Sequence, residues 1–204
     1  MPIDLVLLAA ESNIEHGMRG VLSRPEALGI RPVRFKTYRH PQRDPGCANR
    51  AHDFLRQFCR DYDHALVVFD HEGSGCEHLA PERLEADVTQ RLAANGWGDR
   101  AATIVVFPEL EVWVFGTSPE LEQSLRWRNS TPLRAWLQNR GVWDAGHAKP
   151  ADPKRALESA LREARQPRSS SFYESLAGSV DLTQCQHPAF RRFREALIEW
   201  FPAT

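Results

Sequence analysis

Short apolar runs recur along the chain and predict the strands of a buried sheet. The clearest run covers residues 65–69 (A-L-V-V-F), and similar runs cover residues 3–10 and 103–107. Apolar runs of about four to eight residues bounded by turn residues fit strands that are buried on both faces. Residues 32–38 alternate apolar with basic or polar side chains. This alternation predicts a fourth strand, less buried and nearer an edge of the sheet.

Helical spacing of apolar residues separates these strands. It predicts helices over residues 12–27, 51–62 and 81–95, and the proline-rich polar segment 39–46 predicts a loop. Alternating strands and helices are typical of βαβ units, in which the strands are mostly parallel.

The chain beyond residue 107 is predicted to be mainly helical. Residues 109–116 alternate acidic and large apolar side chains, which favours a strand with its acids on one face, although a short helix also fits. Helical patterns follow at 120–137, 153–161 and 190–201, and the polar segment 166–171 is predicted to be flexible. We therefore expect an α/β protein with a mostly parallel sheet of about four strands flanked by helices. It forms one domain, 1–204, with a core of about 1–116 and a helical C-terminal extension of about 117–204.

Composition is that of a globular protein, with 204 residues of which 42% are hydrophobic and 26% charged. The 26 basic residues nearly balance the 27 acidic ones. This balance argues against a wholesale polyanion binder and leaves room for a local basic patch.

The sequence also predicts a cytoplasmic protein. No stretch approaches the ~18 consecutive apolar residues of a membrane helix, and the N-terminus lacks the cationic start of a secretory signal. The four cysteines are widely spaced, which suits a reducing compartment and neither a disulfide framework nor a structural zinc site.

Acidic residues follow the predicted strands. Glu11 comes after the first strand, and Asp70 and Glu72 come directly after the run 65–69. An isolated D-x-E also fits a loop cap beside a solvated acid. Because the carboxyl ends of parallel strands meet at one edge of the sheet, however, Glu11 and Asp70 are expected to face the same crevice. Glu109 and Glu111 follow the next strand and fit either this site or a solvated face.

Converging carboxylates are hard oxygen ligands that suit Mg²⁺ or Mn²⁺. We expect Glu11, Asp70 and Glu72 to hold a metal and act in catalysis, with Glu11 as a candidate general base. Glu109 and Glu111 are candidates for a second metal position. His71 lies between the paired acids, and on an extended backbone it points away from them, which indicates a structural role.

Candidate phosphate contacts are basic residues near a strand end or in a loop. A nucleic-acid-binding role or simple solvation fits each of them: Lys36, Arg39, His40, Arg43, Lys149 and Lys154.

A strand that ends in Glu and a later strand that ends in D-x-D or D-x-E resemble the TOPRIM domain of topoisomerases, primases, small ribonucleases and overcoming-lysogenization-defect nucleases. Glu11 occupies the position of the family's first glutamate, and Asp70 and Glu72 match its acidic pair. The second acid is Glu here rather than the commoner Asp.

The chain is more similar to small stand-alone TOPRIM-like proteins of bacterial genomes and defence loci. Their E-x-E followed by apolar residues resembles E-L-E-V-W-V-F at 109–115. Looser matches are the lysine-bearing loop at Lys149 and the Cys-x-x-aromatic segment, which here runs from Cys185 to Phe190.

This resemblance implies a metal-dependent phosphodiester-cleaving component of a bacterial defence system against phage or foreign DNA. The expected partners are nucleic acid and other defence proteins, with no membrane, and the oligomeric state stays open. No tyrosine lies in a motif typical of a topoisomerase nucleophile, and we expect no attached ATPase region of the kind that full-length overcoming-lysogenization-defect nucleases have. Two alternatives remain: a non-catalytic binding or assembly module of a defence complex, and phosphatase-like action on a small phosphoester.

Overall fold

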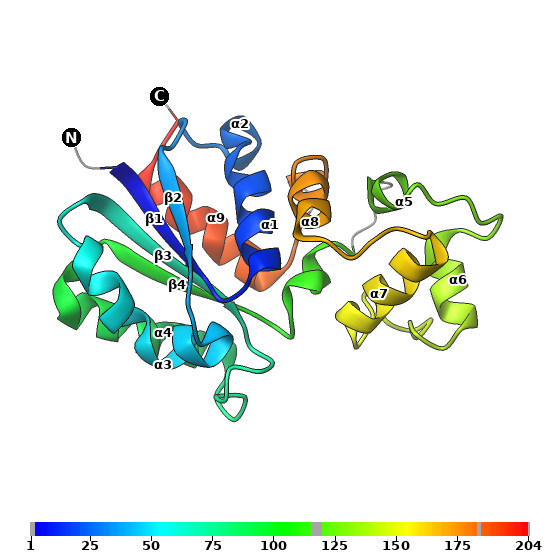
Figure 1. Cartoon of the computed structure of the whole chain (residues 1–204), viewed down its shortest axis with the longest axis horizontal. Coiled ribbons are helices and arrows are strands. Elements are labelled where there is room, and N and C mark those ends of the chain that lie inside the picture. The colour runs from blue at the N-terminus through cyan, green and yellow to red at the C-terminus, as the bar shows by residue number, and fades with distance from the viewer. Residues whose placement is uncertain (1–2, 116–119, 183–184, 204) are drawn as a thin grey trace.

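A computed structural model of the chain describes residues 3–115, 120–182 and 185–203. At its centre lies a parallel sheet of four strands in the order β2-β1-β3-β4 (Figure 1). The strands are β1 (Ile3–Ala9), β2 (Phe35–Arg39), β3 (Tyr62–Asp70) and β4 (Ala101–Val106). The α/β class and the parallel sheet predicted from the sequence are confirmed.

Burial follows the position of each strand. The side chains of β1 from Asp4 to Ala9 are all buried, and so are those of β3 from Ala65 to Asp70. β2 pairs only with β1 among the described strands, and its side chains are half-buried or exposed. The alternating pattern at this edge strand was therefore a sound indicator of its place in the sheet.

Helices cover both faces of the sheet. α3 (Arg43–Leu55) and α4 (Pro81–Leu92) pack against each other and lie on one face, against β3 and β4. α1 (Ser12–Leu22) and α9 (Pro188–Trp200) lie on the other face (Figure 1). The last helix of the chain thus returns to the sheet and completes the core.

The rest of the C-terminal part extends away from the sheet. α5 (Glu120–Leu125), α6 (Leu133–Asn139) and α7 (Pro153–Glu163) form a lobe at one end of the molecule (Figure 1). α8 (Ser170–Ala177) lies between this lobe and the sheet and packs closely against α1. Shorter helical segments are α2 (Pro25–Leu28), η1 (Arg56–Phe58), η2 (Ala93–Trp97) and η3 (Leu110–Trp113). None of the described helices is long and apolar enough to span a lipid bilayer.

The structure corrects the predicted loop at 39–46. α3 already begins at Arg43 and ends at Leu55, so it lies earlier than the predicted helix over 51–62. Its buried residues Cys47, Ala48, Ala51 and Leu55 have helical spacing, and Asp44 and Pro45 lie in its first turn. A proline is compatible with the first turn of a helix, because the amide hydrogen that it lacks has no partner there.

The predicted strand over 109–116 is also wrong. β3 and β4 stop pairing at Asp70 and Val106, so the chain beyond has no neighbouring strand to satisfy its backbone. It forms the 3₁₀ turn η3 instead, with hydrogen bonds from the amides of Val112 and Val114 to the carbonyls of Glu109 and Glu111. The predicted helix over 120–137 is two helices, α5 and α6, and Pro132 caps the second.

Candidate metal centre

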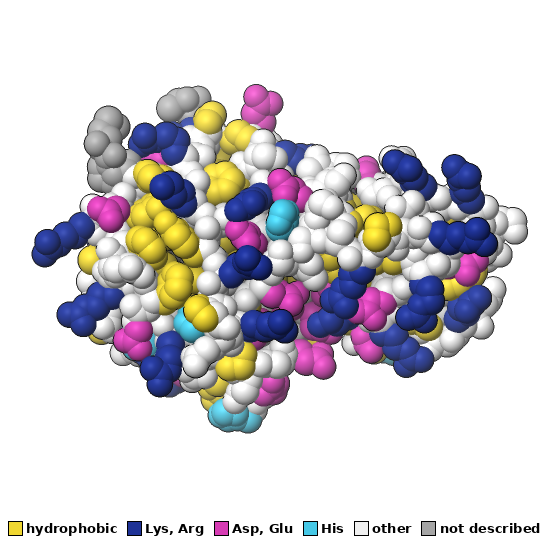
Figure 2. All heavy atoms as spheres, viewed as in Figure 1, with side chains coloured by type: hydrophobic (Ala, Val, Ile, Leu, Met, Phe, Trp, Pro, Cys, Tyr) yellow, Lys and Arg dark blue, Asp and Glu magenta, His cyan; other side chains and the backbone are white. Residues whose placement is uncertain are grey.

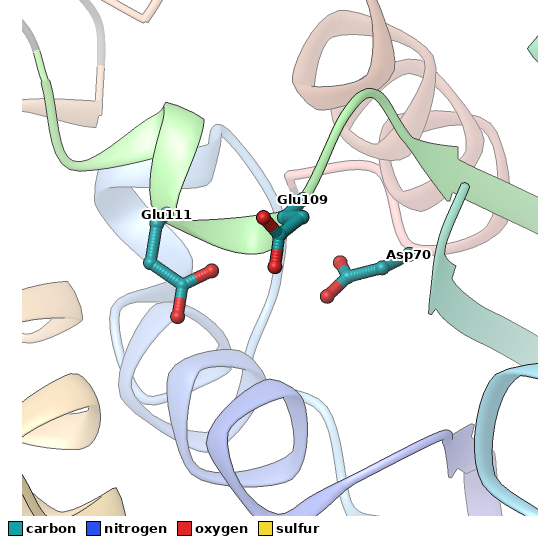
Figure 3. Close-up of side chains that lie close together, drawn as sticks. All are labelled: Asp70, Glu109 and Glu111. Atoms are coloured by element: carbon teal, nitrogen blue, oxygen red, sulfur yellow. The ribbon is translucent and has the colours of Figure 1, made fainter. Parts of the chain in front are cut away.

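Three carboxylates meet at the carboxyl edge of the sheet. Asp70 is the last residue of β3, and Glu109 and Glu111 lie on the segment that follows β4. One oxygen from each side chain lies within 4.8 Å of the others, and the side chains point toward one another (Figure 3). All three residues are at most 5% exposed. Among the described residues, this is the group whose geometry can hold a divalent metal ion.

A hydrogen bond fixes one oxygen of each carboxylate. Asp70 Oδ1 accepts from the amide of Leu110 at 2.8 Å, and Glu111 Oε1 accepts from the Tyr173 hydroxyl at 2.6 Å. Glu109 Oε2 accepts from Lys154 Nζ at 2.7 Å. These bonds hold the side chains in place and leave a second oxygen of each one free of any hydrogen bond from the described residues. Three oriented carboxylates, each with an oxygen left to bind a ligand, fit a site for a divalent cation that prefers oxygen ligands.

The charges of the cluster are crowded and poorly compensated. Burial raises the pKa of the Asp70 carboxyl well above its usual range, and the negative charges of Asp44 and Glu111 raise it further. Burial also raises the pKa of Glu109, although the ammonium group of Lys154 acts in the opposite direction. Lys154 forms an ion pair with Glu109, and the charge of Arg168 also interacts with that of Glu111. A bound divalent cation would relieve the remaining repulsion.

Asp44 belongs to the surroundings of this cluster. From the first turn of α3, its Oδ1 accepts a 2.9 Å hydrogen bond from the amide of Asp70. Burial raises the pKa of Asp44, and the charge of Glu11 acts in the same direction. Asp44 therefore anchors the end of β3 and adds a further carboxyl beside the three.

Glu11 lies beside the cluster but outside it. It is the N-cap residue of α1, directly after β1, and its charge contributes to the raised pKa of Asp70. Its Oε1 accepts a 3.2 Å hydrogen bond from Asn13. Glu11 is not one of the carboxylates within 4.8 Å of one another, so its role as a ligand or general base stays a prediction.

Glu72 also lies outside the group, and it is exposed. Its amide donates to the carbonyl of Pro108, which links the two chain segments that follow β3 and β4. Its charge adds to those that raise the pKa of Glu109. His71 is buried, and its Nε2 bonds to the carbonyl of Leu79, a contact that agrees with the predicted structural role.

Of the predicted phosphate contacts, Lys154 is the one that pairs with an acid of the cluster, Glu109. Lys36 is exposed on β2, and Arg43 is exposed at the start of α3. Arg39 forms an ion pair with Glu15 at 3.1 Å, and Lys149 Nζ donates to the carbonyl of Val112 at 2.6 Å. Their nucleic-acid-binding roles stay predictions.

Tyr173 is a site residue that the sequence analysis did not select. It lies on α8, far along the chain from Glu111, and no motif surrounds it. Asp44 had a signal, since Asp-Pro at 44–45 is the same helix-start pattern that the sequence shows at 152–153.

Comparisons of the chain with protein-family models, with curated proteins and with solved structures found no match.

Proposed function

We propose that this protein is a TOPRIM-like, metal-dependent nuclease component of a cytoplasmic bacterial defence system. The observation that carries the proposal is the buried group of Asp70, Glu109 and Glu111, in which each carboxylate keeps an oxygen that accepts no hydrogen bond from the described residues. Oxygen ligands of this kind suit Mg²⁺ or Mn²⁺, which retain waters and meet substrate phosphates. When bound, the metal would polarise a phosphoryl oxygen and lower the pKa of water.

The chain's own residues have separate tasks in this proposal. Asp70, Glu109 and Glu111 hold the ion, and the hydrogen bonds from Leu110, Lys154 and Tyr173 orient them. Glu11, next to the group at the start of α1, is the candidate general base. Glu72 is exposed, and its charge acts on Glu109, so its proposed role is to contact the metal or the phosphodiester from the solvent side.

The resemblance to TOPRIM domains supports the same reaction. Glu11 follows β1, and Asp70 and Glu72 follow the neighbouring strand β3. A four-stranded parallel sheet with its acids at one edge is the architecture that this resemblance implies.

A basic lobe next to the acids supports a nucleic-acid substrate. Residues 120–168 contain ten lysines and arginines against six aspartates and glutamates, although the whole chain has a net charge of −1. Figure 2 shows Lys and Arg side chains spread over the surface of this lobe, with Asp and Glu gathered where the lobe meets the sheet. Positive charge next to a metal site would attract the phosphate backbone.

A non-catalytic binding or assembly module of a defence complex is the second candidate. It is favoured by Arg39 and Lys149, because both predicted phosphate contacts already have partners, Glu15 and the carbonyl of Val112. In that case the acids bind a metal that stabilises the fold or an interface.

The two candidates differ in a cleavage assay. Purified protein is incubated with end-labelled single-stranded DNA, double-stranded DNA and RNA, with Mg²⁺ or Mn²⁺, alone and with proteins encoded beside its gene. We expect metal-dependent cleavage that Asp70→Asn and Glu111→Gln each reduce by at least about a hundredfold. Glu26→Gln, an exposed acid on α2, is the matched control and retains activity. Mn²⁺ binding without cleavage under any of these conditions would favour the module, and the absence of both would refute the two candidates.

A further inference from the structure

A cavity lies next to the acidic cluster. It has a volume of about 650 Å³, within the range of about 300–1,000 Å³ that is common for small-molecule sites. Its walls come from α1, η3, α8 and the start of α9, together with the loop that precedes α7 and residues 180–182 and 185–187 between α8 and α9. η3 separates the cavity from the acids, since Leu110 and Trp113 line the cavity and Glu111 belongs to the cluster.

Most of the lining is apolar. It includes Met18 and Val21 of α1, Leu176 of α8 and Phe190 of α9. Surfaces of this kind favour a ligand with an apolar body, because such a body gains free energy when it leaves water.

Lys149 supplies a positive charge to the same cavity. Its Nζ donates to the carbonyl of Val112, and no carboxylate of the described residues forms an ion pair with it. An ammonium group has three donors, so two remain for a ligand. Burial lowers the pKa of Lys149, which indicates a charge that lacks full solvation.

The other polar side chains of the lining include Cys185, His187 and the exposed carboxylate of Asp181. Burial raises the pKa of the Cys185 thiol, so this residue stays uncharged near neutral pH. His187 already uses both ring nitrogens, with Nδ1 accepting from Trp113 Nε1 and Nε2 donating to the carbonyl of Phe107. Lys149 is therefore the lysine of this wall that can attract an anion, and its half-buried position distinguishes it from His147 and Asp181, which line the same cavity and are exposed.

From this combination we infer that the cavity binds a small amphipathic anion, an apolar or aromatic body with a single carboxylate or sulfonate that pairs with Lys149. This site is distinct from the metal centre, and it does not depend on the proposed nuclease activity. The two sites share the turn η3 and Tyr173, which lines the cavity and donates to Glu111.

Binding of 8-anilinonaphthalene-1-sulfonate to the full-length folded protein tests the inference, with decanoate and decan-1-ol as competitors. We expect saturable binding at a single site and displacement by decanoate at much lower concentration than by the neutral alcohol of equal length. Lys149→Met should weaken the binding of the dye by at least about tenfold, and Lys149→Arg should restore most of it. Arg60→Met, which removes an exposed charge from the turn before β3, is the matched control and should bind as the wild type.

A second variant tests the volume of the cavity. Val180→Phe adds a ring at a lining position that is only half-buried, and it should reduce binding of the dye while circular dichroism shows an unchanged fold. Absence of saturable binding would overturn the inference. So would equal binding by the wild type and Lys149→Met, or equal displacement by decanoate and decan-1-ol, because either result would indicate a neutral apolar occupant.

Discussion

The hydroxyl of Tyr173 donates a 2.6 Å hydrogen bond to Glu111 Oε1, and both residues are buried. This contact joins α8, in the C-terminal part of the chain, to the turn that follows the last strand of the sheet. Burial raises the pKa of Tyr173 and the charge of Glu111 acts in the same direction, so the phenol stays protonated and remains a donor at neutral pH. The candidate metal centre is thus completed by a residue outside the core of about 1–116.

Tyr173→Phe should weaken Mn²⁺ binding by about tenfold or more, because groups that orient metal ligands typically contribute that much to affinity. The ring is retained, so the packing of α8 should change little. Isothermal titration with Mn²⁺ measures the effect. Tyr38→Phe is the matched control, because it also removes a tyrosine hydroxyl that forms a side-chain hydrogen bond, in this case with Tyr62 and away from the acidic cluster. It should leave the affinity for Mn²⁺ unchanged.

Asp70→Asn should raise the thermal stability of the metal-free protein and abolish its stabilisation by Mn²⁺. The amide oxygen can still accept from Leu110, whereas the residue can no longer carry a buried negative charge beside Asp44 and Glu111. We expect a rise in Tm of about 2–5 °C in EDTA. Calorimetry with and without Mn²⁺ checks both effects. A lower Tm in EDTA would contradict the view that like-charge repulsion dominates at this position.

The sequence was sufficient to predict the sheet and the location of the acidic site. The run 65–69 and the segment 3–10 are buried parallel neighbours, and Asp70 lies at the edge where such sheets place ligands. Which carboxylates form the buried group was harder to predict. Glu109 and Glu111 come together with Asp70 because the chain forms a 3₁₀ turn after β4, and this turn depends on where strand pairing ends.

Side-chain partners were the least predictable part. Lys154 and Tyr173 reach the acids only because α7 and α8 pack against the elements around the cluster. Tertiary packing of this kind has no short-range sequence signal. For Lys149 the sequence did suggest a role, a phosphate contact in a loop. The structure instead places its Nζ against a backbone carbonyl in the wall of an apolar cavity.

His187 should make the stability of the protein depend on pH. Burial, with the charges of Lys149 and Arg192, lowers its pKa to about 4 from the ordinary 6.5. The unfolded state therefore binds more protons than the folded state between these values. The contribution of His187 to the free energy of unfolding is fully present above about pH 6.5. It is lost as the pH falls toward 4, and the loss is about 2 kcal/mol.

Urea unfolding at pH 7 and pH 5 measures this effect. His187→Gln should lose less stability over that interval than the wild type, and His78→Gln, which changes an exposed histidine in the loop before α4, should behave as the wild type does. An equal loss in all three proteins would show that other groups cause the pH dependence.

Two glycines of α1 provide a matched test of how α8 is held. A Cβ at Gly20 would lie 2.4 Å from the backbone oxygen of Glu174 and 2.8 Å from Ala177 Cβ, so α8 would have to move. At Gly17 the nearest atom would be a Leu110 methyl at 3.6 Å, an ordinary contact. Gly20→Ala should therefore destabilise the protein by about 1–3 kcal/mol, and Gly17→Ala should stabilise it by about 0.5–1 kcal/mol.

The two glycine variants also test whether the packing of α8 on α1 controls the candidate metal centre. Displacement of α8 in Gly20→Ala moves Tyr173 away from Glu111, so this variant should also bind Mn²⁺ more weakly at a temperature where it is fully folded. Gly17→Ala should bind Mn²⁺ as the wild type does. Denaturant unfolding and Mn²⁺ titration on the two variants measure both effects. A folded Gly20→Ala protein with unchanged affinity would show that the position of α8 does not control the geometry of Glu111.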